Sequence, residues 1–199
     1  MLLAHLDVKT ILAILAIMVG TASFLPYFWD IFKGTTKPHI FTWLIWVITQ
    51  GTAAAGVLYG GGGLIGGGLV FATFLIFLVV LLCFKYGSKN ITKGDAVILF
   101  FALLAIVVWW QLHNPVLAIF MVAAIDCIGY FPTYRKVLTE PWSENLSTWI
   151  FFSVAYVFTI AALKEYNLLT VPYLVACLIA NLILVGICSV QRLKIPKPI

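Results

Sequence analysis

The stretch LPYFWDIFKGTTKPHIFTWLIW, residues 25–46, has a related copy 106 positions later, FPTYRKVLTEPWSENLSTWIFF, residues 131–152. Pro26 aligns with Pro132, and the Thr-Trp pair near the end of each copy aligns without a gap. Each copy contains, in the same order, an apolar segment, a proline near its end, a polar turn and the Thr-Trp pair. Duplicated halves are a common way to build a membrane protein around a central site. The copies therefore predict two similar structural units.

The composition indicates a membrane protein. Apolar residues make up 63% of the 199 residues, charged residues make up 10%, and the mean hydropathy is +1.11. A soluble domain of this length could not bury so much apolar surface around one core. The pI of about 9.1 would suit a nucleic-acid-binding protein, but the basic residues stand between apolar segments, where they act as topology signals. We therefore expect an integral membrane protein without a nucleic-acid partner.

The sequence contains no pattern typical of an enzyme or a cofactor site. Its four cysteines fall within apolar segments and lack the paired spacing of a metal site, so we interpret them as small buried apolar residues. Its three histidines lie near separate segment ends, and no nucleophile, base and acid form a recognisable set. We expect no catalytic activity, no cofactor and no metal ion.

Apolar stretches long enough to cross a bilayer recur along the whole chain. A helix needs about 20 mainly apolar residues to cross the hydrocarbon layer. Seven stretches approach this length: 10–32, 39–59, 64–84, 96–112, 115–134, 147–163 and 168–190.

The repeat pairs the first three spans with the last three and leaves the fourth span without a partner. An odd linker helix is needed for two three-helix units to share one orientation, because three crossings leave the chain on the opposite side of the membrane. The sequence thus predicts an all-α fold of seven transmembrane helices. Two parallel three-helix bundles, 1–88 and 115–199 with its tail, are joined by a linker helix at 89–114.

The distribution of basic residues gives an orientation. With seven spans, two of the 12 Lys and Arg residues fall on the N-terminal side of the membrane and ten fall on the other side. Since cytoplasmic loops carry the excess of basic residues, we expect the N-terminus outside and the C-terminus in the cytoplasm, in a plasma or bacterial inner membrane. The first span could instead be a signal peptide, because small residues at 21–23 follow an apolar run within it, but the repeat argues against its removal.

This order of three helices, one helix and three helices resembles the PQ-loop superfamily, which includes the SWEET sugar transporters and cystinosin-like carriers. The resemblance rests on the proline of each first helix and the Thr-Trp pair of each second helix, and it covers nearly the whole chain. Tyr27 and Thr133 stand where the family motif has a glutamine after the proline. The resemblance implies two bundles around an axis normal to the membrane, with a substrate between them near the midplane.

Pro26 and Pro132 are candidate hinges. Proline removes one backbone donor and clashes with the preceding turn, so each helix should kink at this position. Movement about both prolines would close one end of a central cavity while the other end opens. The alternative is a static kink that only shapes the packing, because proline is common in membrane helices.

Asp126 lies within an apolar span, in the sequence VAAIDCIGYFP. A carboxylate there is costly unless it is paired, hydrated or protonated, so an ionisable residue in such a position indicates function. We predict that Asp126 binds substrate or exchanges a proton during transport. The alternative is a carboxyl group bonded to a neighbouring helix purely for packing. Its counterpart in the first copy is Gly20, so the site should be asymmetric.

Asn181 is the second polar residue inside an apolar span, where its amide needs a partner. SWEET-like carriers hold sugar hydroxyls with asparagines of their third and seventh helices, and the resemblance gives Asn181 the role in the seventh. In the third helix Thr73 is the nearest candidate. The alternative is an amide that joins two helices.

Aromatic and polar residues of the second and sixth spans are predicted to complete the pocket. A sugar ring has an apolar face that stacks on indole, so we assign Trp46 to the pocket wall. Trp43 and Trp149 could belong to the same wall or to the interfacial belt, and we favour the belt. Four residues deeper in these spans are predicted polar pocket members: Thr49, Gln50, Ser153 and Tyr156.

These features predict a small-solute transporter that works by alternating access, with a SWEET-like sugar uniporter as the first expectation. A proton-coupled carrier of amino acids or other small solutes would use Asp126, which a sugar uniporter does not require. A PnuC-like vitamin transporter has a similar architecture, and a receptor that binds without transport is the alternative of a different class. The expected partners are a small polar solute, such as a sugar or an amino acid, and the lipid bilayer; a homo-oligomer is left open.

Overall fold

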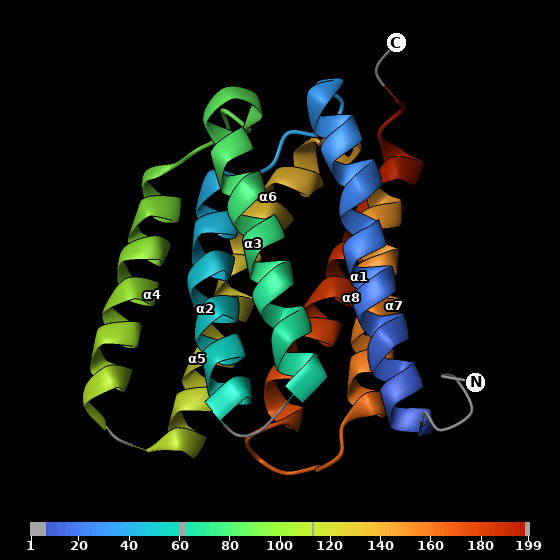
Figure 1. Ribbon diagram of the computed structural model, residues 1–199. Helices are drawn as coiled ribbons and strands as arrows, with labels where there is room; N and C mark the ends of the chain where they lie inside the picture. Colours follow the sequence, from blue (N-terminus) through green and yellow to red (C-terminus); the bar gives the residue numbers. More distant parts are fainter. Residues whose placement is uncertain (1–6, 60–62, 113, 198–199) are drawn as a thin grey trace.

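The computed structural model describes residues 7–59, 63–112 and 114–197, which form an all-α bundle (Figure 1). Three of the described helices are long and apolar enough to cross a membrane: α1 (Val8–Phe32), α3 (Gly63–Tyr86) and α8 (Val171–Lys194). They indicate an integral membrane protein. The other elements are α2 (Ile40–Tyr59), α4 (Lys93–Leu112), α5 (Pro115–Gly129), α6 (Phe131–Thr139), the short 3₁₀ helix η2 (Pro141–Ser143) and α7 (Leu146–Ala162).

Short polar residues set the start of several helices. The side chains of Asp7, Asn114 and Asn145 each accept a hydrogen bond from a backbone N–H in the first turn of α1, α5 and α7. Such caps satisfy donors that have no partner within the helix. The expectation of an all-α fold with apolar helices long enough to cross a membrane is confirmed, and most predicted spans end within a few residues of the observed helices.

The fifth predicted span differs, because the structure divides it between α5 and α6. The division falls at Tyr130, and Pro132 lies in the first turn of α6. Proline is compatible with this position because the first N–H groups of a helix have no intrahelical acceptor. Its counterpart Pro26 lies inside α1, which continues to Phe32. The two prolines therefore occupy different local structures, and their role as hinges stays a prediction.

The helix contacts follow the same pattern in the two halves of the chain. In the first half α3 contacts both α1 and α2, and in the second half α8 contacts both α5 and α7. Across the halves, α1 contacts α7 and α2 contacts α5, while α4 lies at one edge against α5 and α2 (Figure 1). Gly68 brings α3 close to α1, since a Cβ atom on it would lie 2.6 Å from Cγ1 of Ile17.

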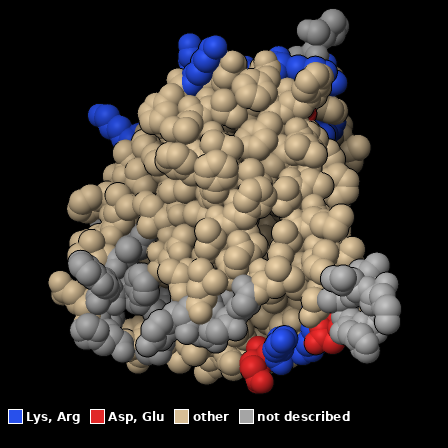
Figure 2. All heavy atoms as spheres, viewed as in Figure 1, with Lys and Arg blue, Asp and Glu red and all other residues tan. Residues whose placement is uncertain are grey.

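Charged side chains gather at the ends of the bundle. On the face shown in Figure 2, Lys and Arg side chains cluster at the upper end, which is the end where the C-terminus lies in Figure 1. Between the two ends this face shows no charged side chain among the described residues. An uncharged band between polar ends is the surface that a bilayer requires.

Candidate functional site

A cavity of about 120 Å³ lies among α1, α2, α3, α5, α7 and α8. At roughly 10–15 Å³ per water molecule on this measure of volume, it has room for about ten waters. Small residues such as Ala13, Gly20 and Ala155 border it along α1 and α7, and aromatic residues border it nearer to the end of the bundle where α2 begins. The cavity therefore has the size of a small organic solute.

Aromatic rings form one end of the cavity. Trp43 from α2 and Trp149 from α7 face each other with ring centres 6.2 Å apart, and Trp46 lies 5.7 Å from Trp149. Tyr130, between α5 and α6, lies 4.4 Å from Trp46, and Phe24 from α1 lies 6.3 Å from Trp43. Ring pairs at these separations pack favourably and leave little space between them. They close this end of the cavity with rings from α1, α2, α7 and the junction of α5 and α6.

The assignment of Trp43 and Trp149 to the interfacial belt was wrong. Both side chains are only 1% exposed and line the cavity. The Nε1 atom of Trp149 donates a hydrogen bond to Oε2 of Glu144 at 3.2 Å, so its polar atom is satisfied inside the protein. A tryptophan near the end of a span belongs to the interfacial belt only if its side chain points toward the lipid. In α2 and α7 the side chains of Trp43 and Trp149 point into the protein.

Asp126 lines the cavity from α5 and is 3% exposed. Its carboxylate accepts hydrogen bonds from the hydroxyl of Thr49, from the hydroxyl of Tyr173 at 3.5 Å and from the thiol of Cys177 at 3.3 Å. The Nε1 atom of Trp46 donates to its backbone oxygen at 3.3 Å. No lysine, arginine or histidine pairs with Asp126 among the residues that the structure describes.

Asn181 lines the cavity from α8 and is 1% exposed. Its Nδ2 atom donates to the backbone oxygen of Cys177 at 3.2 Å, whereas its Oδ1 atom has no partner. Cys177 thus contacts both Asp126 and Asn181. A buried amide oxygen without a donor is unusual in a folded protein and marks a place where a ligand or a water would bind.

The remaining predicted pocket residues divide into two groups. Gln50 and Tyr156 line the cavity together with Trp46, Asp126 and Asn181. Ser153 and Thr73 do not line it: Ser153 donates to the backbone oxygen of Trp149 at 2.9 Å and borders an outer groove between α7 and α8, and Thr73 donates to Leu69 at 2.8 Å.

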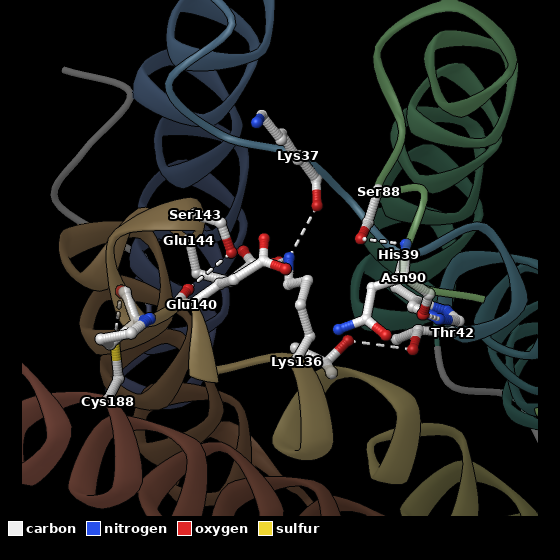
Figure 3. Close-up of polar contacts among 12 residues, drawn as sticks. Lys37, His39, Thr42, Ser88, Asn90, Lys136, Glu140, Ser143, Glu144 and Cys188 are labelled. Atoms are coloured by element: carbon white, nitrogen blue, oxygen red, sulfur yellow. Dashed lines mark hydrogen bonds and ion pairs between the residues drawn. The ribbon is translucent and has the colours of Figure 1, made fainter. Parts of the chain in front are cut away.

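A buried ion pair lies beyond the aromatic end of the cavity (Figure 3). Lys136 from α6 pairs with Glu144, and the two side chains are 0% and 1% exposed. The hydroxyl of Tyr27 donates to Glu144 at 3.1 Å, and the Lys136 ammonium also donates to the backbone oxygen of Lys37 at 2.6 Å. Sequence reasoning missed this pair, because a lysine between two spans was counted only as a topology signal.

A second charged cluster, formed by Asp95, Arg135 and His39, lies at the same end, and Figure 3 labels His39 of this cluster. Asp95 at the start of α4 accepts from the guanidinium of Arg135 at 2.6 Å and lies 3.5 Å from Nε2 of His39. Burial lowers the pKa of His39, although Asp95 acts in the opposite direction. The hydroxyls of Thr42 and Thr133 share a hydrogen bond of 2.9 Å between the two clusters. Polar contacts thus join α1, α2, α4, α6 and α7 across this end.

Among the described residues, no group of three or more His, Cys, Asp or Glu side chains could hold a metal ion. Comparison of the chain with protein-family models, with curated proteins and with solved structures finds no match. The central cavity, with its carboxylate and its unpartnered amide oxygen, is therefore the candidate site that the geometry offers.

Proposed function

We propose that this chain is a membrane carrier that moves a small polar solute through the central cavity by alternating access. In this proposal α1, α2 and α3 form one repeat, α5 with α6, α7 and α8 form the second, and α4 is the linker between them. The helix contacts within each half support this division into repeats, because α3 packs against α1 and α2, and α8 packs against α5 and α7. Carriers built from parallel repeats place their substrate between the repeats.

The observation that carries the proposal is the agreement between the sequence repeat and the cavity wall. The offset of 106 positions comes from the proline and Thr-Trp alignment alone. Applied to the cavity, it pairs residues that both line the wall, and a wall built from equivalent positions is what two repeats around a shared site would produce. Five such pairs are Gly20 with Asp126, Phe24 with Tyr130, Trp43 with Trp149, Trp46 with Phe152 and Gln50 with Tyr156.

The two ends of the cavity suggest which way the carrier is open. The aromatic rings and the Lys136–Glu144 pair close the end that is rich in basic residues, and Ala13 and Thr159 border the cavity toward the opposite end. If the basic end is cytoplasmic, this conformation is closed to the cytoplasm. Transport would then require the contacts around Lys136 and Glu144 to open, with Pro26 and Pro132 as the hinges.

A sugar is the first solute class to test. The aromatic rings can stack on the apolar face of a sugar, and the amides of Gln50 and Asn181 can bond its hydroxyls. Asp126 favours a second version of the carrier. A carboxyl group in the cavity can bind and release a proton, so coupling of solute movement to a proton gradient would use it.

Flux into proteoliposomes tests the carrier proposal. Purified protein is reconstituted, and the uptake of labelled glucose, sucrose, amino acids and nucleosides is measured with and without a pH gradient. We expect saturable uptake of at least one solute and its loss in Asn181→Ala, whose side chain lines the cavity. The matched control is Ile183→Ala on the same helix, because Ile183 is exposed on the outer surface.

The outcomes separate the alternatives. Uptake that ignores the pH gradient and survives Asp126→Asn would remove proton coupling. Saturable binding of a solute without any flux would favour a receptor over a carrier. Normal uptake by folded Asn181→Ala would remove the cavity as the transport site.

A further inference from the structure

We propose that the cavity binds a small organic cation with an aromatic ring and a protonated primary amine, and this inference rests on the carrier proposal for the same site. The observations that carry it are a buried carboxylate without a cation, an amide oxygen without a donor, and a cluster of aromatic rings that line the same cavity. Each of the three restricts the chemistry of the solute in a different way.

The carboxylate requires a positive charge. Asp126 is 3% exposed, and the groups that donate to it are neutral hydroxyls and a thiol. None of the described residues that line the cavity is a lysine, an arginine or a histidine. Because an unpaired buried carboxylate is costly, the charge must come from a bound proton or from the solute.

The unpaired amide oxygen near Asp126 requires a hydrogen-bond donor from the solute. The Nδ2 atom of Asn181 is engaged with Cys177, which leaves Oδ1 as a free acceptor. Cys177 also contacts Asp126, so the amide oxygen and the carboxylate belong to one wall formed by α5 and α8. A primary ammonium has three N–H donors and no acceptor, which matches two acceptors on one wall. A sugar hydroxyl carries no charge, so with a sugar in the cavity Asp126 would still need a bound proton.

The aromatic rings complete the match. Trp46 contacts the backbone oxygen of Asp126, and its ring lies 4.4 Å from that of Tyr130, which follows Asp126 by four residues and caps the end of α5. A cation beside the face of an indole or phenol is attracted to it, and an aryl group can stack on the same surface. The room for about ten waters fits a solute of about ten non-hydrogen atoms.

Binding of 2-phenylethylammonium and of its neutral isostere 2-phenylethanol tests the inference. The purified full chain in detergent is titrated with each probe, and binding is read from tryptophan fluorescence and from the shift in unfolding temperature. We expect the ammonium to bind about tenfold to a hundredfold more tightly than the alcohol, the range for a hydrogen-bonded charge. Asp126→Asn should remove this preference, while Glu165→Gln, at an exposed acidic residue outside the cavity, should keep it.

The wild-type comparison remains decisive if Asp126→Asn does not fold. Equal affinity for the two probes, no binding of the ammonium, or an unchanged preference in Asp126→Asn would each overturn the inference. The carrier proposal fails separately. Saturable glucose uptake without ammonium binding would support the carrier proposal and overturn the inference of a cationic solute. Ammonium binding without flux of any solute would support the cationic solute and overturn the carrier proposal.

Discussion

Glu144 and Asp126 are both buried acidic residues, 2% and 3% exposed, but the protein surrounds them differently. Glu144 pairs with the ammonium of Lys136 and accepts further hydrogen bonds from Tyr27 and Trp149. Asp126 accepts only from neutral groups among the described residues, and it borders a cavity.

The difference separates a carboxylate that holds the fold together from one that is left available to a ligand. A buried ion needs an opposite charge, and the chain supplies it to Glu144 from a position eight residues earlier. It supplies none to Asp126 among the residues described. Substitutions at the two sites should therefore affect different properties, which the following variants test in order of expected effect on stability.

Lys136→Met should have the largest effect. It leaves Glu144 buried without a cation, so the free energy of unfolding should fall by about 3–5 kcal/mol. Reversible unfolding in mixed micelles, followed by tryptophan fluorescence, measures this change. Lys37→Met is the matched control and should change stability by less than about 0.5 kcal/mol, because Lys37 is exposed and only its backbone oxygen contacts Lys136. A loss below about 1 kcal/mol in Lys136→Met would contradict a structural role for the pair.

Asp95→Asn should have an intermediate effect. The change removes the charge that pairs with Arg135, whose side chain is 38% exposed, so screening by solvent reduces the loss to about 1–2 kcal/mol. The same unfolding measurement applies, and a double-mutant cycle with Arg135→Gln isolates the pair. A coupling energy of zero in that cycle would show that the contact between Asp95 and Arg135 does not contribute to stability.

Acidification should weaken the same cluster through His39. Burial lowers the pKa of His39 in the folded protein, so the unfolded chain binds the proton more readily. The contribution of His39 to stability is complete above its unfolded pKa of about 6.5 and is lost as pH falls toward the folded value. Unfolding measured from pH 7.5 to pH 5 should show this loss, and His39→Gln should reduce it. An identical pH dependence in the variant would assign the loss to other groups.

Asp126→Asn should have the smallest effect on stability. Hydrogen bonds within membrane proteins contribute modestly, and asparagine keeps one acceptor oxygen for Thr49, so we expect a change within about 1 kcal/mol. The preference for 2-phenylethylammonium over 2-phenylethanol should be lost in the same protein. A large destabilisation with the preference retained would reverse the roles that we assign to Asp126 and Glu144.

The sequence predicted the helices well because apolar length is a local property. It also placed Trp46, Gln50, Asp126, Tyr156 and Asn181 on segments that meet at the cavity. It could not give the rotation of each helix, since each successive residue turns by about 100° and the facing side depends on neighbouring helices. Thr73 and Ser153 lie on α3 and α7, which border the cavity, but their side chains do not line it.

The charged end of the bundle was harder to predict for a different reason. Lys136 is typical of a residue that marks a cytoplasmic loop, and its burial depends on the turn formed by η2, which brings Glu144 back toward α6. The pattern of α6 carried no signal of this burial. Its buried residues include Thr133, Lys136 and Val137, whereas the apolar side chains of Phe131 and Leu138 are exposed.

The order in which the helices are synthesised has a consequence for Asp126. Of the side chains that donate to its carboxylate, Thr49 on α2 is synthesised before α5, but Tyr173 and Cys177 belong to α8, which is synthesised after α5. Until α8 packs against α5, the carboxylate therefore has only Thr49 among these three donors. A chain truncated before Val171 would lack both Tyr173 and Cys177, so an apolar segment would carry a carboxylate that has lost two of its three donors.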